Sequence, residues 1–185
     1  MTHEAHDGNG ILNGNGRKNG GSPLELRRIY AEQLLSIRAA EDRSAAAFPD
    51  MAIVAADEDV ASVFRAAASD TEIQLARLNQ LIRGLDLPTD EVSVPELDGI
   101  LADVGAVLEG EVEGTTRDID AALLRFAREA LRYQIAGYET ACATARRLGD
   151  YRSLDVLLQS LDEELTTDSS FSRLMSQHSR LARSI

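Results

Sequence analysis

The sequence predicts an all-α fold, a four-helix bundle with an additional short helix in the crossover, behind a disordered N-terminal tail. The composition favours helices, because aromatic residues are few, with four Phe, four Tyr and no Trp. Apolar residues also recur at three- and four-residue steps along four long segments, the period of an amphipathic helix. The length of 185 residues suits one domain with a sizeable core. We therefore expect a tail over residues 1–21 and one helical domain over residues 22–185.

The first 21 residues pair low hydrophobicity with dense Gly and Asn. Such a segment cannot bury enough apolar surface to offset the entropy lost when it is ordered. We expect a disordered arm. His3 and His6 lie within it, and we interpret them as solvated side chains and not as metal ligands.

The first long helix is expected to begin at Ser22, which serves as the N-cap, with Glu25 three residues later completing a capping box. It should run to about Phe48, because Pro49 lacks the N–H that would continue the helix. Residues 51–56 then read as a short apolar connector.

The second helix should begin at the acidic residues 57–59, whose charges suit the positive end of a helix dipole, and stop at Gly84. Its apolar periodicity is the strongest in the chain. A loop with one proline follows. Ser93 and Glu96 then form a second capping-box pattern ahead of a shorter helix, which should end within residues 110–114.

The two remaining long helices are predicted from their ends. One should start at residues 116–118, reach Leu148 and be closed by Gly149. Its apolar surface is wide enough to touch two neighbours, so we place it inside the bundle. The last helix should start near Ser153 and continue through Met175.

The charge balance excludes two classes of partner. Asp and Glu number 31 against 19 Lys and Arg, which gives a formal net charge of −12. Such a protein repels nucleic acid and anionic membrane, and we expect to find neither as a partner. Cys142, the single cysteine, has no cysteine in the chain to pair with, and no signal-type or 18-residue apolar run is present. These features favour a cytoplasmic location.

Several segments, in order along residues 23–181, carry a family resemblance. They are residues 25–30, residues 70–72, residues 160–164 and, most clearly, residues 133–140 with the sequence Tyr-Gln-Ile-Ala-Gly-Tyr-Glu-Thr. The chain resembles the YciF-like family, a branch of the ferritin-like superfamily that is associated with bacterial stress responses. The resemblance implies a ferritin-like bundle, whose connectivity includes one long crossover.

Members of that family hold a metal pair with carboxylates and histidines on inner helix faces, and this chain departs from that pattern. Ungapped matching from Tyr30 puts the first-helix Glu of the family on Gln33 and the second-helix His on Ala67. Amide and methyl groups bring no charge to offset two metal cations. The resemblance thus implies a vestigial site at Gln33, Ala67, Asp70, Leu131, Arg132, Gln134, Glu163 and Glu164. The polar side chains of this vestigial site form either a buried hydrogen-bond network or a boundary of the core that is in contact with water.

Two further acids could act as alternative ligands, Glu32 and Glu41, if the helix register shifted locally. In the other interpretation, Glu32 and Glu41 are both surface residues. Glu32 would then be solvated beside Arg28, and Glu41 would pair with Arg38 or Arg43.

Two functional hypotheses follow. The first is a non-catalytic, stress-associated scaffold that has no catalytic residue or cofactor and acts through self-association, as a homodimer, or through binding another protein. The second is a metal-dependent oxidase or iron-handling protein, with iron or manganese held by a residual carboxylate site. The loss of ligands favours the first hypothesis.

Overall fold

The structure is a computed structural model, and it describes residues 22–85, 92–111 and 114–182. Within these ranges the chain forms five helices. Their bounds are α1 Pro23–Val54, α2 Glu58–Gly84, α3 Pro95–Leu108, α4 Thr116–Leu148 and α5 Tyr151–Ala182. The predicted disordered arm over residues 1–21 lies outside the described residues.

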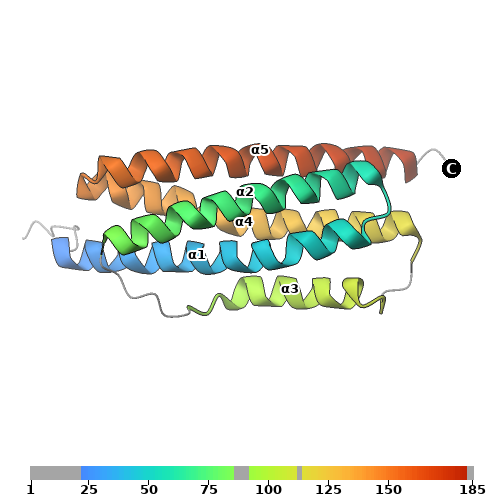
Figure 1. Ribbon diagram of the computed structural model, residues 1–185, viewed down its shortest axis with the longest axis horizontal. Helices are drawn as coiled ribbons and strands as arrows, with labels where there is room; N and C mark the ends of the chain where they lie inside the picture. The colour runs from blue at the N-terminus through green and yellow to red at the C-terminus, as the bar shows by residue number, and fades with distance from the viewer. Residues whose placement is uncertain (1–21, 86–91, 112–113, 183–185) are drawn as a thin grey trace, which may run out of the picture.

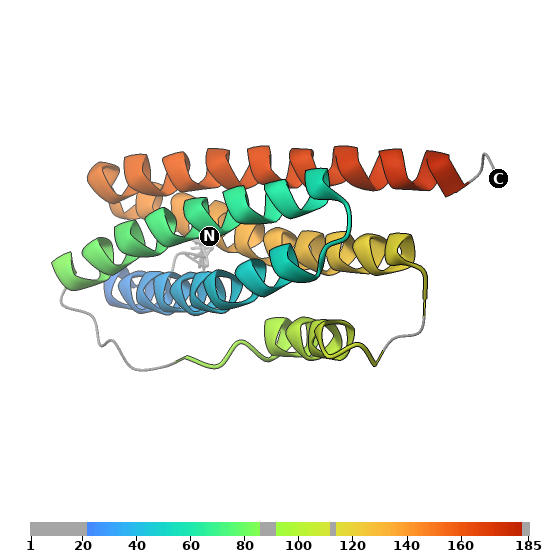
Figure 2. The same ribbon diagram turned by 45° about the vertical axis from the view of Figure 1, so that its right-hand side comes forward.

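Four long helices lie side by side along the long axis of the molecule, as Figure 1 shows. The short turns after α1 and α4 make α1 and α2 antiparallel, and likewise α4 and α5. The shorter α3 lies outside this bundle against α1 and α4, within the crossover that connects α2 to α4 (Figure 2). The all-α four-helix bundle with an extra helix in its crossover is therefore confirmed.

Polar caps start the helices where the sequence predicts. Ser22 Oγ accepts a hydrogen bond from the backbone N–H of Glu25 at 3.2 Å, and the Asp57 side chain accepts from the N–H of Asp59 at 2.8 Å. Gly149 closes α4 with a left-handed φ of 72°, which only glycine adopts without strain.

One predicted cap is wrong. The residue before α3 is Val94, and no side chain caps this helix, so Ser93 does not form the expected capping box. The fifth helix begins at Tyr151, slightly before Ser153, near which its start was expected. Asp150 explains the earlier start, because its Oδ1 accepts from the N–H of Ser153 at 3.2 Å and so satisfies an N–H group of the first turn.

The prediction that Pro49 ends the first helix is also wrong, because α1 continues through it to Val54. Residues 51–54 are therefore helical and not a connector. Proline costs one backbone hydrogen bond at this point, yet Met51 and Ala52 are buried in the core. Their apolar burial offsets the lost bond.

The turn between α1 and α2 is held by a residue from α4. The carboxylate of Asp120 is buried and accepts hydrogen bonds from the backbone N–H groups of Ala56 at 2.8 Å and Asp57 at 3.0 Å. A carboxylate that accepts two such bonds is a charge-assisted contact of the stronger kind. The first helical hairpin is thus tied to the start of α4.

The core has an apolar cluster at each end and polar residues between them. Phe48, Phe64 and Phe171 belong to the cluster at the end where α1 meets α2. Leu34 and Tyr138 belong to the cluster at the opposite end. Between the segments that supply these two clusters, the four long helices carry buried polar residues, with at least one on each helix. They mark the level at which a functional site would lie.

Candidate functional site: a buried polar layer

We call the buried polar residues between the two apolar clusters the polar layer. Its members are Glu41 and Ser44 of α1, Thr71 and Gln74 of α2, Gln134 of α4, and Ser160 and Glu164 of α5. Each of the four long helices therefore contributes at least one side chain. Buried polar groups need hydrogen-bond partners, so this layer is the most constrained part of the interior.

Glu41 is the centre of the hydrogen bonds that the layer makes. Its side chain is fully buried, with an exposed fraction of 0%. Oε2 accepts a hydrogen bond from Gln134 Nε2 at 2.9 Å, and Oε1 accepts from the Tyr138 hydroxyl at 2.8 Å. Both donors come from α4, so this carboxyl group links α1 to α4 through the middle of the bundle.

The neighbouring acids of α5 differ in their surroundings. Glu163 lies at the edge of the layer, where Arg77 donates to its Oε2 at 2.6 Å and Gln74 Nε2 donates to the same atom at 3.3 Å. Glu164 is buried, and its Oε2 accepts no hydrogen bond. Of these two acids, Glu163 has a cationic partner and Glu164 has an oxygen without a donor.

Burial, and to a smaller extent the charge of neighbouring acids, opposes ionisation of the two buried acids. Burial raises the pKa of Glu41 to about 8, and the Tyr138 hydroxyl only partly offsets this effect. Burial, and then the charge of Glu41, raises the pKa of Glu164 well above its ordinary value. Burial acts in the same direction on Glu163, but the hydrogen bond and charge of Arg77 outweigh it and leave the pKa of Glu163 lowered. Near neutral pH, therefore, Glu41 holds a proton in most molecules.

Several oxygen atoms of the layer lack a donor. Oε1 of Gln74, Oε1 of Gln134, Oε2 of Glu164 and Oγ of Ser44 are all buried and make no hydrogen bond. The two amide oxygens are acceptors alone, whereas the Ser44 hydroxyl and a protonated Glu164 can also donate. Such a layer can bind protons, water or another hydrogen-bond donor.

The positions of the expected vestigial site are separated in the structure. Gln134 and Glu164 lie in the polar layer, and Glu163 lies at its edge. Ala67 and Leu131 belong to the adjoining apolar cluster. The remaining three positions are Gln33, which is half-buried, and Asp70 and Arg132, which are exposed.

The two alternative ligands, Glu32 and Glu41, differ in their surroundings: Glu32 is exposed and Glu41 is buried. Glu32 is exposed and accepts a hydrogen bond from Arg28 at 2.5 Å, so its interpretation as a surface residue is confirmed. The same interpretation is wrong for Glu41, which faces the core, while Arg43 pairs with Asp98 of α3. The α1 carboxyl group that meets Gln134 is thus Glu41. Gln33 lies eight residues earlier, about 12 Å along the helix.

The sequence-based prediction of the site did not include Ser44, Thr71, Gln74 and Ser160 of the polar layer, or Tyr138, which donates to Glu41. A signal for the whole α1 contribution was present in the sequence, because Glu41 and Ser44 lie between Ile37 and Phe48 at steps of four, three and four residues. That spacing puts two polar residues on an apolar stripe. Such an interruption indicates a buried polar contact.

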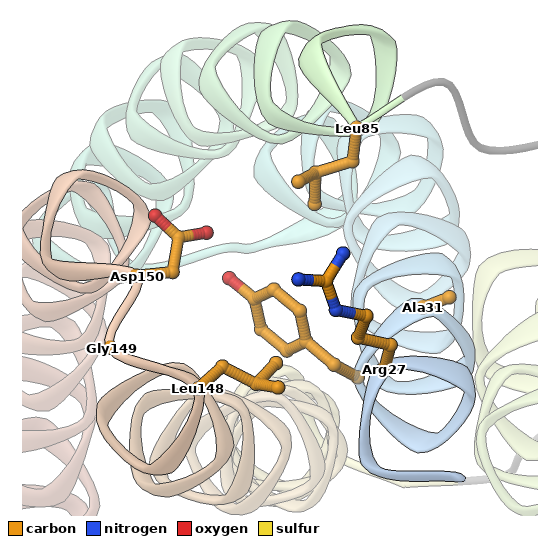
Figure 3. A pocket seen from close by; sticks show the side chains of 7 residues that line it. Arg27, Ala31, Leu85, Leu148, Gly149 and Asp150 are labelled. Atoms are coloured by element: carbon orange, nitrogen blue, oxygen red, sulfur yellow. The ribbon is translucent and has the colours of Figure 1, made fainter. Parts of the chain in front are cut away.

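Among the hollows on the surface, two border α1. The first has a volume of about 320 Å³ and lies where α1, the end of α2 and the turn between α4 and α5 meet. Arg27 and Asp150 extend toward it from opposite sides, between Leu85 and Leu148 (Figure 3). Tyr30, a further lining residue, has a buried hydroxyl group. Because the lining carries both charges, it does not select a ligand of one sign.

The second hollow, which we call the side groove, lies between α1 and α4 and has a volume of about 380 Å³. Gln134 lines it, so it is the hollow that reaches the polar layer. At its floor the two helices approach closely: a Cβ on Gly137 would come within 2.9 Å of Ile37 Cγ1. Glycine is required there for packing, since the next larger side chain would clash.

The helices and their order define the class of protein, an all-α four-helix bundle with an additional helix in its crossover. The chain belongs to the family described as a domain of unknown function, DUF892, whose profile matches residues 25–182. Protein YciF of Escherichia coli K12 is 25% identical over 144 residues, which cover 77% of this chain and 86% of that protein. The predicted membership of a YciF-like family is confirmed.

Solved structures agree with the fold. The crystal structure of the E. coli stress protein YciF superposes with a TM-score of 0.77 at 23% identity, covering 84% of this chain and 97% of that one. YcfI from Rhodopseudomonas palustris, described as a proposed structural protein, has a TM-score of 0.74 at 26% identity, covering 80% and 92%. In the part of the chain that the structure describes, no helix is long and apolar enough to cross a membrane.

Proposed function

We propose that this protein is a cytoplasmic, stress-associated scaffold that works by self-association or by binding another protein, without catalysis and without a metal pair. The composition of the polar layer carries the proposal. It offers two carboxyl groups, Glu41 and Glu164, and two amides, Gln74 and Gln134. Across the described ranges, no group of three or more His, Cys, Asp or Glu side chains is placed to hold a metal ion.

The chemistry of a metal pair explains why this donor set argues against one. Two divalent cations in a bundle of this kind need roughly six hard ligands whose charge offsets their own. Amide oxygens bring no charge, and a carboxyl group that keeps its proton is a poor ligand. The raised pKa values of Glu41 and Glu164 therefore favour a layer that holds protons.

We expect elemental analysis of the purified protein to find well below one iron or manganese atom per chain, even after growth or refolding with excess metal. The matched variant carries Glu41→Gln and Glu164→Gln, which removes both buried acids. On our proposal its metal content equals that of the unmodified protein. If the unmodified protein held about two metal atoms per chain tightly and the variant lost them, the scaffold proposal would be contradicted and the alternative function supported.

That alternative is a metal-dependent oxidase or iron-handling protein. One observation favours it, namely that Glu41 and Glu164 lie in one layer and the charge of Glu41 raises the pKa of Glu164. A cation between them would remove that cost. The residues of such a site would be these two acids, with Glu163 at the edge of the layer.

Self-association would use an apolar stripe on α5. Tyr151, Leu158 and Leu165 follow each other at seven-residue steps, and their exposed fractions are 65%, 40% and 46%. A homodimer is the assembly that we expect. A stripe with this period pairs with a second copy of itself about a two-fold axis. Among the described residues α4 exposes no large apolar side chain, so α5 is the better candidate for the contact.

We expect the unmodified protein to be a dimer at tens of micromolar by light scattering, and the Leu158→Glu, Leu165→Glu variant to be a monomer. Both positions are exposed, so the melting temperature at low concentration should change little. Ile53→Glu is the matched control, since that side chain is 80% exposed on α1 and lies outside the stripe. A monomeric unmodified protein, or a dimeric double variant, would contradict the assignment.

A further inference from the structure

α3 has the weakest local support of the described helices. It lies outside the four-helix bundle (Figure 2), and its 14 residues make a helix that is marginal in water without tertiary contacts. Of these residues 3 are buried, Leu97, Val104 and Val107, whereas 13 of the 33 residues of α4 are buried. No side chain caps its first turn. The stability of α3 therefore depends on the surface against which it packs.

Two interior glycines weaken α3 further. A Cβ on Gly99 or on Gly105 would meet no atom within 4 Å outside the helix backbone, so packing does not require glycine at either position. Gly137 of α4 differs, because a Cβ there would come within 2.9 Å of Ile37. Each interior glycine destabilises a helix relative to alanine, since glycine loses more conformational entropy when it is ordered. The two glycines make α3 easier to unwind and do not improve its fit.

The surface beneath the first half of α3 consists of small side chains. We call it the α3 seat, and its buried residues are Ala39 and Ala40 of α1 and Ala130 of α4. Leu97 packs in the same cluster as these alanines. Tyr133 borders this cluster and also lines the side groove, so the seat and the groove are continuous. Without α3, they would form one longer apolar trough between α1 and α4.

Charge contributes little to holding α3 in place. Asp98 pairs with Arg43 of α1, but these side chains are 45% and 22% exposed, and an ion pair in contact with solvent adds little stability. The apolar contacts of Leu97, Val104 and Val107 are therefore the main interactions that hold α3.

We propose that α3 is a lid that leaves its seat and unwinds while the four long helices stay packed, so that its opening uncovers the trough formed by the seat and the side groove. The long helices supply the polar layer and the buried residues of both apolar clusters, apart from Val104 and Val107. Their packing is thus largely independent of α3, and such a local opening costs less free energy than global unfolding. The lid is independent of the scaffold function, since it needs neither a second copy nor a partner.

Native-state hydrogen exchange of the full chain in low urea tests the lid. We expect the amides of residues 99–108 to be protected at least about 100-fold less than the slowest amides of α1 and α4. Their exchange should also depend only weakly on urea, because the opening exposes a small part of the surface. Equal protection, or one urea dependence shared by all the helices, would show that α3 opens only in global unfolding and would overturn the proposal.

Substitutions within α3 should change its opening selectively. Gly99→Ala combined with Gly105→Ala should slow exchange in α3 about tenfold, because both alanines favour the helix and neither clashes. Ala102→Gly, at an exposed position of α3, should speed it about fivefold. Ala76→Gly makes the same change at an exposed position of α2, and as the matched control it should leave exchange in α3 unchanged. Unchanged exchange in both α3 variants would contradict the lid.

A thiol placed in the seat reports whether the seat itself is uncovered. In a Cys142→Ser background, Ala39→Cys puts a thiol beneath α3, and Ala127→Cys puts one among the buried residues of the bundle. We expect a thiol reagent to modify position 39 at least about 100-fold faster than position 127, and the two glycine substitutions to slow only the reaction at position 39. Equal rates at the two positions would mean that α3 does not leave its seat separately.

Discussion

Raising the pH from about 5.5 to about 8 is expected to lower the free energy of unfolding, and Glu41→Gln should remove much of that loss. The pKa of Glu41 is raised by burial to about 8 in the folded chain, against an ordinary value of 4.5. The folded state therefore keeps a proton that the unfolded state has released. The stability from this proton is complete below pH 4.5 and is lost as the pH rises through about 8, by roughly 1 kcal/mol for each pH unit.

The groups that face Glu41 act in the same direction or stay neutral over this range. From α4 these are Gln134 and Tyr138, and from α5 they are Glu163 and Glu164. The pKa of Glu164 is raised as well, which makes the free energy of unfolding fall more steeply as the pH rises. The lowered pKa of Glu163 affects stability below this range, because its contribution is lost as the pH falls through that lowered value.

Urea denaturation at several pH values measures the effect in the unmodified protein and in two variants. Glu41→Gln keeps the shape and an acceptor for the Tyr138 hydroxyl, but it cannot ionise, so its gain over the unmodified protein should grow as the pH rises. Glu32→Gln makes the same chemical change at an exposed position of α1 and should follow the unmodified curve. Parallel curves for Glu41→Gln and the unmodified protein would show that Glu41 ionises in the core without cost.

Phe171→Ala is expected to cost about 3–5 kcal/mol of stability, which is the largest effect of a single substitution that the structure suggests. The Phe171 ring is fully buried and lies 5.0 Å from Phe64 and 6.3 Å from Phe48, between ring centroids. These rings come from α5, α2 and α1, so the substitution opens a cavity where three helices meet. Tilted ring pairs add a smaller contribution beyond their burial.

Chemical denaturation of Phe171→Ala at a fixed pH checks this value. Ile53→Ala also removes a large apolar side chain, but from a position that is 80% exposed, and it should change stability by less than about 0.5 kcal/mol. A loss below about 1 kcal/mol for Phe171→Ala would mean that the three rings do not form one packed cluster.

Helix ends were predictable wherever a local signal decides them. Asp57 and Gly149 mark the start of α2 and the end of α4, because a side-chain cap and a left-handed glycine act within a few residues. Pro49 was misjudged because its local cost is outweighed by burial of Met51 and Ala52, which depends on other helices. Local rules therefore fail where tertiary packing supplies the larger free energy.

The polar layer could be predicted only in part for a related reason. Gln134 and Glu164 were assigned to the site from their own segments, but the α1 partner was placed at Gln33 in place of Glu41. Periodicity shows which face of a helix is buried, and it does not show which residues of two helices lie at the same height. That height is fixed by the axial stagger of the packed helices, here by contacts such as Gly137 against Ile37.

The Asp120 carboxylate affects how the chain folds. It binds the N–H groups of Ala56 and Asp57 across separations of 64 and 63 residues. The start of α2 is therefore completed by α4, a segment that follows α3. The chain must lose the entropy of closing this long loop before the hydrogen bonds to Asp120 can stabilise it. On a ribosome, the α1–α2 hairpin would emerge with these amides still bonded to water. The first half of the protein then gains its final rigidity only when α4 has been synthesised and docked.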